Sequence, residues 1–303
     1  MSYSHGIVLG CPRSGTTFLM SVLNTIPKFE CLSGTLLPVA IPHVVNQPVS
    51  KEVYDALTVG FERAIDAYLY SGRYHSRAAA LQKWVRAPSG IDNLLRALKG
   101  HRDLPGRMIY KEPFLSFAPQ FVLDALPDAR IIHIVRDGRD CANSLVKSYD
   151  VLTDEKLTHL RGSEMRLGRR YDERYVPWWV EDGRDTEFIE STPYVRAIWM
   201  WKEMVSRCRA VYGRSGEKSE GQVLVLKYEE FMHDPVTQGH RVLQHFGAAP
   251  TAAFEKRIAQ ARTSSIGKYK KRAVQEIKEA ERIARNDLQA FGYEPTVTTE
   301  QKV

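Results

Sequence analysis

The sequence predicts a three-layer α/β/α fold in which helices cover both faces of a central parallel sheet. Two observations lead to this prediction. Short, continuous apolar runs rich in β-branched residues are typical of strands that are buried on both faces. These runs alternate along the chain with patterns of helical spacing, which indicates repeated strand, helix, strand units. The chain has 303 residues, and we expect one domain over residues 1–303.

Four short apolar runs are the predicted strands. In chain order they occupy residues 6–10, 108–111, 130–135 and 222–227. Apolar residues at intervals of three and four predict the helices. These helices fall at residues 17–26, 54–68, 118–126, 197–211 and 236–246. Strand and helix therefore alternate through most of the chain.

Residues 150–192 do not follow this alternation. The stretch is rich in charge and lacks sustained periodicity, so we interpret it as a helical or loop insertion rather than core. We expect it to form a wall or lid beside a ligand-binding site. Its aromatic and basic side chains can stack on a ring and attract an anion, or they can equally pack the insertion against the sheet. They are Trp178, Trp179, Tyr171, Tyr175, Arg161, Arg166, Arg169, Arg170 and Arg174.

The charge balance favours an anionic small ligand over nucleic acid. Lys and Arg number 43 and Asp and Glu 36, which gives a formal net charge of +7. The basic residues are spread along the chain and do not form a basic arm that would bind nucleic acid. We therefore expect a ligand that carries phosphate or sulfate. No apolar run approaches the roughly 18 residues of a membrane span. Four scattered cysteines without a CxxC pair, and no leader pattern, favour a cytoplasmic protein.

The strongest motif is the loop between the first strand and the first helix. It reads Gly10-Cys-Pro-Arg-Ser-Gly-Thr-Thr17, and a glycine-rich turn that opens a helix presents backbone N–H groups to phosphate. The glycine spacing matches GxxxxGK[ST], which makes the predicted fold one of the P-loop type. However, Thr16 replaces the lysine that contacts a nucleoside triphosphate, and the cation is Arg13. No predicted strand ends in an Asp for magnesium, so we expect neither ATP hydrolysis nor a metal site.

A second motif begins where the strand at residues 130–135 ends. Arg136 stands at the carboxyl end of this strand, and Ser144 follows eight positions later inside the next helix. Ligands of open α/β sheets bind at this edge. The spacing allows both side chains to contact one phosphate.

Together these residues resemble the sulfotransferase superfamily, whose members use 3′-phosphoadenosine 5′-phosphosulfate (PAPS). Residues 12–17 look like the family's 5′-phosphosulfate loop, and Arg136 with Ser144 matches its 3′-phosphate motif. Three further segments resemble family segments in the same chain order. They are residues 110–114, 226–230 and 265–269. The resemblance is strongest to the tyrosylprotein and bacterial branch, because the cytosolic branch carries lysine where Arg13 stands.

The resemblance implies a metal-independent, in-line transfer of a sulfuryl group from PAPS to a hydroxyl or amine. The acceptor is expected to be a small molecule or a glycan, although peptidyl tyrosine also stays open. Residues 150–192 are then expected to form the acceptor-side wall or lid. Arg13 and Lys111 would stabilise the charge of the transferred group, and Tyr228 would contact adenine. Lys268 would join Arg136 and Ser144 at the 3′-phosphate. The nucleotide-binding residues that the resemblance assigns are Arg13, Ser14, Gly15, Thr16, Thr17, Arg136, Ser144, Tyr228 and Lys268.

The resemblance does not assign the general base to any residue of this chain. Tyrosylprotein relatives carry a glutamate shortly after the first helix, but residues 31–35 contain no acid. Cytosolic relatives carry a histidine where this chain has Pro113. The candidates are His43, Glu30 and Glu112, and we favour His43 because neutral imidazole has a suitable pKa. Glu112 should face away from Lys111, since side chains alternate along a strand, and we expect it to give local support.

Two other functions use the same features. A nucleotide or small-molecule kinase would share the loop and the fold, but it needs the missing lysine and a magnesium ligand. A module that only binds a bisphosphate nucleotide would keep Arg136 and Ser144 and would not need Lys111. The presence of Lys111 favours an enzyme. The sequence does not fix the oligomeric state.

Overall fold

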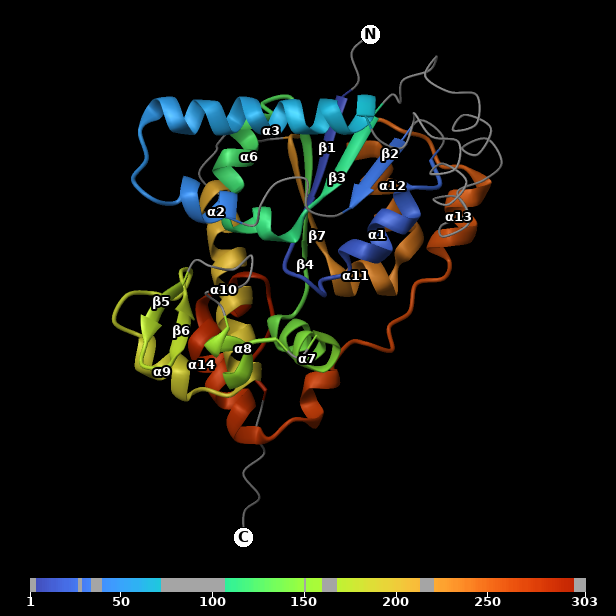
Figure 1. The fold of residues 1–303 in the computed structure, drawn as a ribbon. Helices are drawn as coiled ribbons and strands as arrows, with labels where there is room; N and C mark the ends of the chain where they lie inside the picture. The colour runs from blue at the N-terminus through green and yellow to red at the C-terminus, as the bar shows by residue number, and fades with distance from the viewer. Residues whose placement is uncertain are drawn as a thin grey trace.

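The structure is a computed structural model that describes residues 4–26, 29–33, 40–71, 107–149, 151–159, 168–212 and 221–296. A five-stranded parallel sheet forms its middle layer (Figure 1). In spatial order the strands are β2 (Phe29–Ser33), β3 (Arg107–Lys111), β1 (Ser4–Leu9), β4 (Arg130–Val135) and β7 (Val223–Lys227). All neighbouring strands in this sheet run parallel. The predicted fold class is therefore confirmed.

Alternate residues of the strands pack against helices on opposite faces of the sheet. On one face, Val8 and Ile132 pack against four helices. These are α1 (Thr16–Leu23), α11 (Tyr228–His233), α12 (Pro235–His245) and α13 (Ala252–Ile258). On the other face, Ile7 and Ile131 pack against α3 (Lys51–Ser71) and α6 (Pro119–Ala125).

A second group of elements gathers at the carboxyl end of the sheet (Figure 1). Its helices are α7 (Gly138–Tyr149), α8 (Asp154–Thr158), α9 (Asp185–Glu190), α10 (Pro193–Tyr212) and α14 (Val274–Ala290). A hairpin of β5 (Gly168–Tyr171) and β6 (Arg174–Pro177) lies beside them. Three short elements complete the described chain. They are α2 (Ala40–Val45) and the 3₁₀-helices η1 (Pro113–Phe117) and η4 (Lys268–Lys271).

The stretch that the sequence marks as an insertion contains part of the core. Val176, Trp179 and Phe188 are buried among the side chains of α7, α10 and α14. The expectation that this stretch lies outside the core is therefore wrong for these residues. The physical reason is that β5, β6 and α9 are each too short to show a periodic pattern. Arg161 and Arg166 lie outside the described residues.

Within the described residues, none of the helices combines the length and the apolar character that a membrane crossing requires.

Candidate functional site

The loop between β1 and α1 has a backbone that few sequences can adopt. Gly10 has φ +147°, and a Cβ there would lie 2.4 Å from the carbonyl oxygen of Ile134. Gly15 has φ +98°, and a Cβ there would lie 2.5 Å from the ring of Tyr228. Between them Arg13 has φ +74°, a conformation that costs an L-residue roughly 1–2 kcal/mol. Strain of this kind persists where function requires the shape, so the loop is a candidate site.

The inside of this loop offers polar groups to an anion. Ser14 is fully buried, and its Oγ has no hydrogen-bond partner among the described residues. Thr16 is buried as well, whereas Thr17 is exposed. Helix α1 begins at Thr16 without a side-chain cap from Gly15, so the N–H groups of its first turn face the loop. This arrangement is the usual backbone site for a phosphate.

Arg136 links the loop to two other segments. Its Nη1 donates to the carbonyl oxygen of Arg13 (3.0 Å), and its Nη2 donates to that of Ser265 (2.6 Å). The guanidinium lies 4.6 Å from the ring centroid of Tyr228. Arg136 is only 5% exposed, and its Nε has no partner among the residues described. The side chain is therefore held in place, and a ligand could supply the partner that its Nε lacks among the described residues.

Tyr228 lies between the phosphate loop and Ser265. Its ring packs on Gly15 and beneath Arg136, and its hydroxyl forms a 2.8 Å hydrogen bond with Ser265 Oγ. The contact with adenine that the resemblance implies stays a prediction.

Arg13 and Ser144 meet, although 131 residues separate them. Arg13 Nε donates to Ser144 Oγ (2.9 Å), and Nη1 donates to the hydroxyl of Tyr149 (3.4 Å). The guanidinium also lies 5.5 Å from the ring centroid of Tyr149. The cation of the phosphate loop is thus beside the serine of the second motif, and Tyr149 is a neighbour that the sequence did not indicate.

Lys111 ends β3 at the same edge of the sheet, in register with Val8 and Ser33. Partial burial lowers the pKa of its ammonium group, and the nearby Glu112 carboxylate and Tyr149 oppose this shift. Glu112 caps η1, because its carboxylate accepts the N–H of Phe114 (3.2 Å). This cap is the local support that the sequence predicts for Glu112.

The two other candidate bases occupy different environments. His43 lies on α2 with its ring 5.3 Å from that of Trp178, and burial lowers its pKa. Its Nδ1 is buried and has no hydrogen-bond partner in the described part of the chain. Glu30 pairs with Met108, three residues before the end of the strand, which is about 10 Å from the carboxyl edge. This position places Glu30 away from the edge that carries Lys111.

We call residues 168–190 the hairpin region, and most of its arginines form contacts within it. Arg169 pairs with Asp185 and donates to the carbonyl oxygen of Val180 (3.1 Å). Arg174 pairs with Asp154 (3.0 Å). Arg170 is exposed and is a better candidate for a ligand contact. The other aromatic and basic side chains divide in the same way. Tyr171 bonds to Thr186, Trp179 is core, and Trp178 reaches His43 and Phe117.

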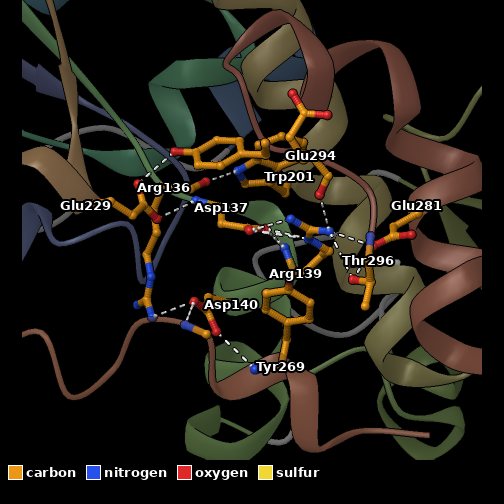
Figure 2. Close-up of polar contacts among 12 residues, drawn as sticks. Arg136, Asp137, Arg139, Asp140, Trp201, Glu229, Tyr269, Glu281, Glu294 and Thr296 are labelled. Carbon is orange, nitrogen blue, oxygen red and sulfur yellow. Dashed lines mark hydrogen bonds and ion pairs between the residues drawn. The ribbon is translucent and has the colours of Figure 1, made fainter. Parts of the chain in front are cut away.

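The segment Val135-Arg-Asp-Gly-Arg-Asp140 binds several distant parts of the chain (Figure 2). Asp137 N–H donates to Glu229 Oε1 (3.0 Å), and Trp201 Nε1 donates to the carbonyl oxygen of Arg136 (3.0 Å). Arg139 pairs with Asp137 (2.8 Å) and donates to the carbonyl oxygen of Glu294 (3.0 Å). The sequence analysis identified Arg136 but missed Asp137, Arg139 and Asp140, for which the dense alternation of opposite charges was the available signal.

Asp140 fixes the segment that carries Lys268. Its carboxylate accepts the backbone N–H groups of Gly267 and Tyr269, and Lys268 itself is exposed. Among the described residues no group of three or more His, Cys, Asp or Glu side chains has an arrangement suited to a metal ion.

Comparison with known proteins gives the site its context. Protein-tyrosine sulfotransferase A of Caenorhabditis elegans is 24% identical over 152 residues, which are 50% of this chain and 35% of that protein. The chain thus matches about a third of that relative's length.

Two solved structures are similar to this chain. The sulfotransferase domain from the curacin biosynthetic pathway is 14% identical with a TM-score of 0.50, over 97% of this chain and 100% of that chain. Sulfotransferase STF9 from Mycobacterium avium is 19% identical with a TM-score of 0.49, over 96% of this chain and 78% of that chain. The first of these likenesses agrees with the three-layer fold. A sequence profile described as Sulfotransferase family matches residues 7–190, which is more than half of the chain. The chain therefore belongs to the sulfotransferase family.

Proposed function

We propose that this protein transfers a sulfuryl group from PAPS to a hydroxyl or amine on a small molecule or glycan. One observation carries the proposal. The two candidate anion-binding motifs adjoin at one edge of the sheet, because Arg136 bonds to the backbone of the phosphate loop and Ser144 bonds to Arg13. A nucleotide with phosphates on both its 5′ and 3′ positions needs two such sites, whereas ATP needs one.

The residues of this edge fit that nucleotide. The buried Ser14 Oγ and the first-turn N–H groups of α1 would hold the 5′-phosphate, together with the hydroxyls of Thr16 and Thr17. Arg136 Nε, Ser144 and Lys268 would hold the 3′-phosphate. Ser14 Oγ and Arg136 Nε are buried polar atoms without partners in the described residues, and such atoms cost free energy unless a ligand satisfies them.

The proposed transfer breaks the bond between sulfur and the 5′-phosphate oxygen. It forms a bond between sulfur and the hydroxyl oxygen or amine nitrogen of the acceptor. Lys111 would neutralise charge on the departing oxygen, and burial, which lowers the pKa of its ammonium group, supports this role. Arg13 would stabilise the oxygens of the sulfuryl group. Contacts of this kind act mainly on the transition state, where charge develops, and they need no metal ion.

His43 would take the proton that the acceptor loses. Burial lowers the pKa of His43, so its imidazole is neutral near pH 7 and can accept a proton. Trp178 packs beside it, which supports a position for residues 150–192 as the acceptor-side wall of a single domain over residues 1–303.

Thermal denaturation with added nucleotides tests the proposal. Adenosine 3′,5′-bisphosphate should raise the melting temperature, because a ligand at 100 times its Kd stabilises the native state by about 2.7 kcal/mol. AMP, which lacks the 3′-phosphate, should have a smaller effect, and ATP with magnesium should have little. A large shift with ATP and magnesium, and none with adenosine 3′,5′-bisphosphate, would instead indicate a kinase.

An acceptor screen with a mass readout tests the second half of the proposal. Incubation with PAPS in EDTA should add a sulfuryl group to at least one hydroxyl or amine compound and release adenosine 3′,5′-bisphosphate. Turnover that EDTA abolishes and magnesium restores would contradict the metal-independent mechanism.

A further inference from the structure

Asp140 is a buried carboxylate whose two oxygens both bind one distant segment. Oδ2 accepts the N–H of Gly267 (2.6 Å), and Oδ1 accepts the N–H of Tyr269 (3.0 Å) (Figure 2). Its side chain is 1% exposed, and Oδ2 lies 3.8 Å from Arg136 Nη2. Hydrogen bonds to an ionised acceptor are about twice as strong as neutral ones. The carboxylate therefore fixes both amides firmly.

The residue between these two amides is Lys268, which is exposed. The segment is anchored a third time at Ser265, whose carbonyl oxygen accepts from Arg136 Nη2. Gly267 has φ +73°, which permits the sharp turn that begins η4. The residues on either side of Lys268 thus bond to Arg136 and Asp140, which belong to the second motif.

The position of the Asp140 carboxylate needs an explanation, because its negative charge repels an anionic ligand. Asp140 reduces the positive potential of Arg136, and the Asp137 carboxylate nearby adds to the negative charge. An uncharged side chain in place of Asp140 would make Arg136 a stronger ligand for phosphate than it is beside the carboxylate. The compensating effect is order, since a segment that is already fixed loses less conformational entropy when the ligand binds.

We propose that Asp140 is a positioning residue for the 3′-phosphate, because it holds Lys268 at that phosphate by binding the backbone amides on either side of the lysine. The inference rests on the proposed function, since it assumes a nucleotide with a 3′-phosphate. It predicts that the contributions of Asp140 and Lys268 to binding are coupled. Residues that act on a ligand independently give additive effects, whereas a residue that acts through another does not.

A double-mutant cycle measured by calorimetry tests this coupling. Wild type, Asp140→Ala, Lys268→Ala and the double variant are titrated with adenosine 3′,5′-bisphosphate and with AMP. Lys268→Ala should weaken the bisphosphate roughly tenfold and leave AMP within about twofold, as for loss of a charged contact to one phosphate. In the Asp140→Ala background, Lys268→Ala should have almost no further effect. Lys51→Ala is the matched control, because Lys51 is an exposed lysine on α3 that pairs with Asp55.

The outcomes separate the inference from the function on which it rests. A wild-type protein that does not bind adenosine 3′,5′-bisphosphate overturns the proposed function. Wild-type binding with additive effects, or equal losses for the bisphosphate and AMP in Asp140→Ala, overturns the role of Asp140 alone. If Asp140→Ala does not fold, Asp140→Asn carries the same cycle, because the amide keeps one acceptor oxygen and removes the charge. Faster hydrogen exchange at Gly267 and Tyr269 in either variant should accompany the coupling.

Discussion

The edge that we propose binds the donor (the donor edge) and the side that we propose binds the acceptor (the acceptor side) are built from different interactions. At the donor edge, Arg136 and Asp140 join segments more than 120 residues apart through hydrogen bonds to backbone groups. On the acceptor side, His43 and Trp178 meet by ring packing, and Phe117 lies against the same indole. Polar groups at fixed positions select a particular ligand, whereas packed rings adapt to many shapes.

The difference has a consequence for substitutions. Changes at the donor edge should alter one ligand or one step of the reaction, since each side chain has a defined partner. Changes among the packed aromatic residues should alter stability or acceptor affinity according to burial.

The largest expected effect is on stability, at Trp179. This side chain is 5% exposed, stacks on Phe117 at 6.0 Å and meets Phe188 edge to face at 5.7 Å. Trp179→Ala should lower the free energy of unfolding by about 3–5 kcal/mol, as large aromatic truncations in cores do. Urea denaturation measures this loss. A change below about 1 kcal/mol would show that this part of the hairpin region is not core.

The second expectation concerns Arg13 and the rate of transfer. Arg13→Ala should lower kcat by roughly two to three orders of magnitude, because removal of a charge-stabilising donor typically has this effect. The measurement is PAPS turnover with an acceptor found in the mass screen.

Arg13 also contacts Ser144, so nucleotide binding provides the control. The Kd for adenosine 3′,5′-bisphosphate should change much less than kcat. Weakened binding with an intact kcat would assign Arg13 to the 3′-phosphate instead of the sulfuryl group.

The third expectation is that the free energy of unfolding falls in acid because of His133, which lies on β4 near the donor edge. His133 on β4 is 1% exposed, and burial lowers its pKa to about 4. Well above pH 6.5 the imidazole is neutral in both folded and unfolded protein. As the pH falls from 6.5 to 4, the unfolded state takes up a proton first, so stability falls by roughly 3 kcal/mol in total.

His133→Leu should flatten that part of the stability curve, measured by urea denaturation from pH 7.5 to 4. His245, whose pKa is also lowered to about 4, remains in both proteins, so the difference between the curves belongs to His133. Parallel curves for the variant and the wild type would contradict the assignment.

The smallest expected effect is at Trp178, the neighbour of Trp179. Trp178 is partly buried between His43 and Arg207, on the side that we assign to the acceptor. Trp178→Ala should raise the KM for the acceptor several-fold and leave the Kd for adenosine 3′,5′-bisphosphate within about twofold. A variant that is destabilised as much as Trp179→Ala would assign both indoles to the core.

The sequence predicted the parallel sheet better than the rest of the fold because the information for each strand is local. Strands β1, β3, β4 and β7 are apolar runs, and the phosphate loop lies between neighbouring elements. Strand β2 was missed because Phe29–Ser33 contains Glu30 and ends in a serine, so it does not form an apolar run.

What the sequence could not provide depends on contacts between distant segments. Asp140 binds Gly267 across 127 residues, and no local pattern contains that pairing. Trp178 and Trp179 are identical neighbours in the sequence, and only the packing of the hairpin region buries one more deeply than the other. Long α14 was missed for a related reason, since its buried positions are interrupted by charged residues that face outward.

The most direct test of the account is the effect of Arg136→Ala on two nucleotides. Arg136 is proposed to bind only the 3′-phosphate, so calorimetry should show adenosine 3′,5′-bisphosphate weakened roughly ten- to a hundredfold more than AMP, as for a charged contact of about 1.5–3 kcal/mol. AMP serves as the internal control, because general damage to the loop that Arg136 supports would weaken both ligands. Equal losses for the two nucleotides would contradict the assignment of this edge to a 3′-phosphate and with it the proposal that PAPS is the donor.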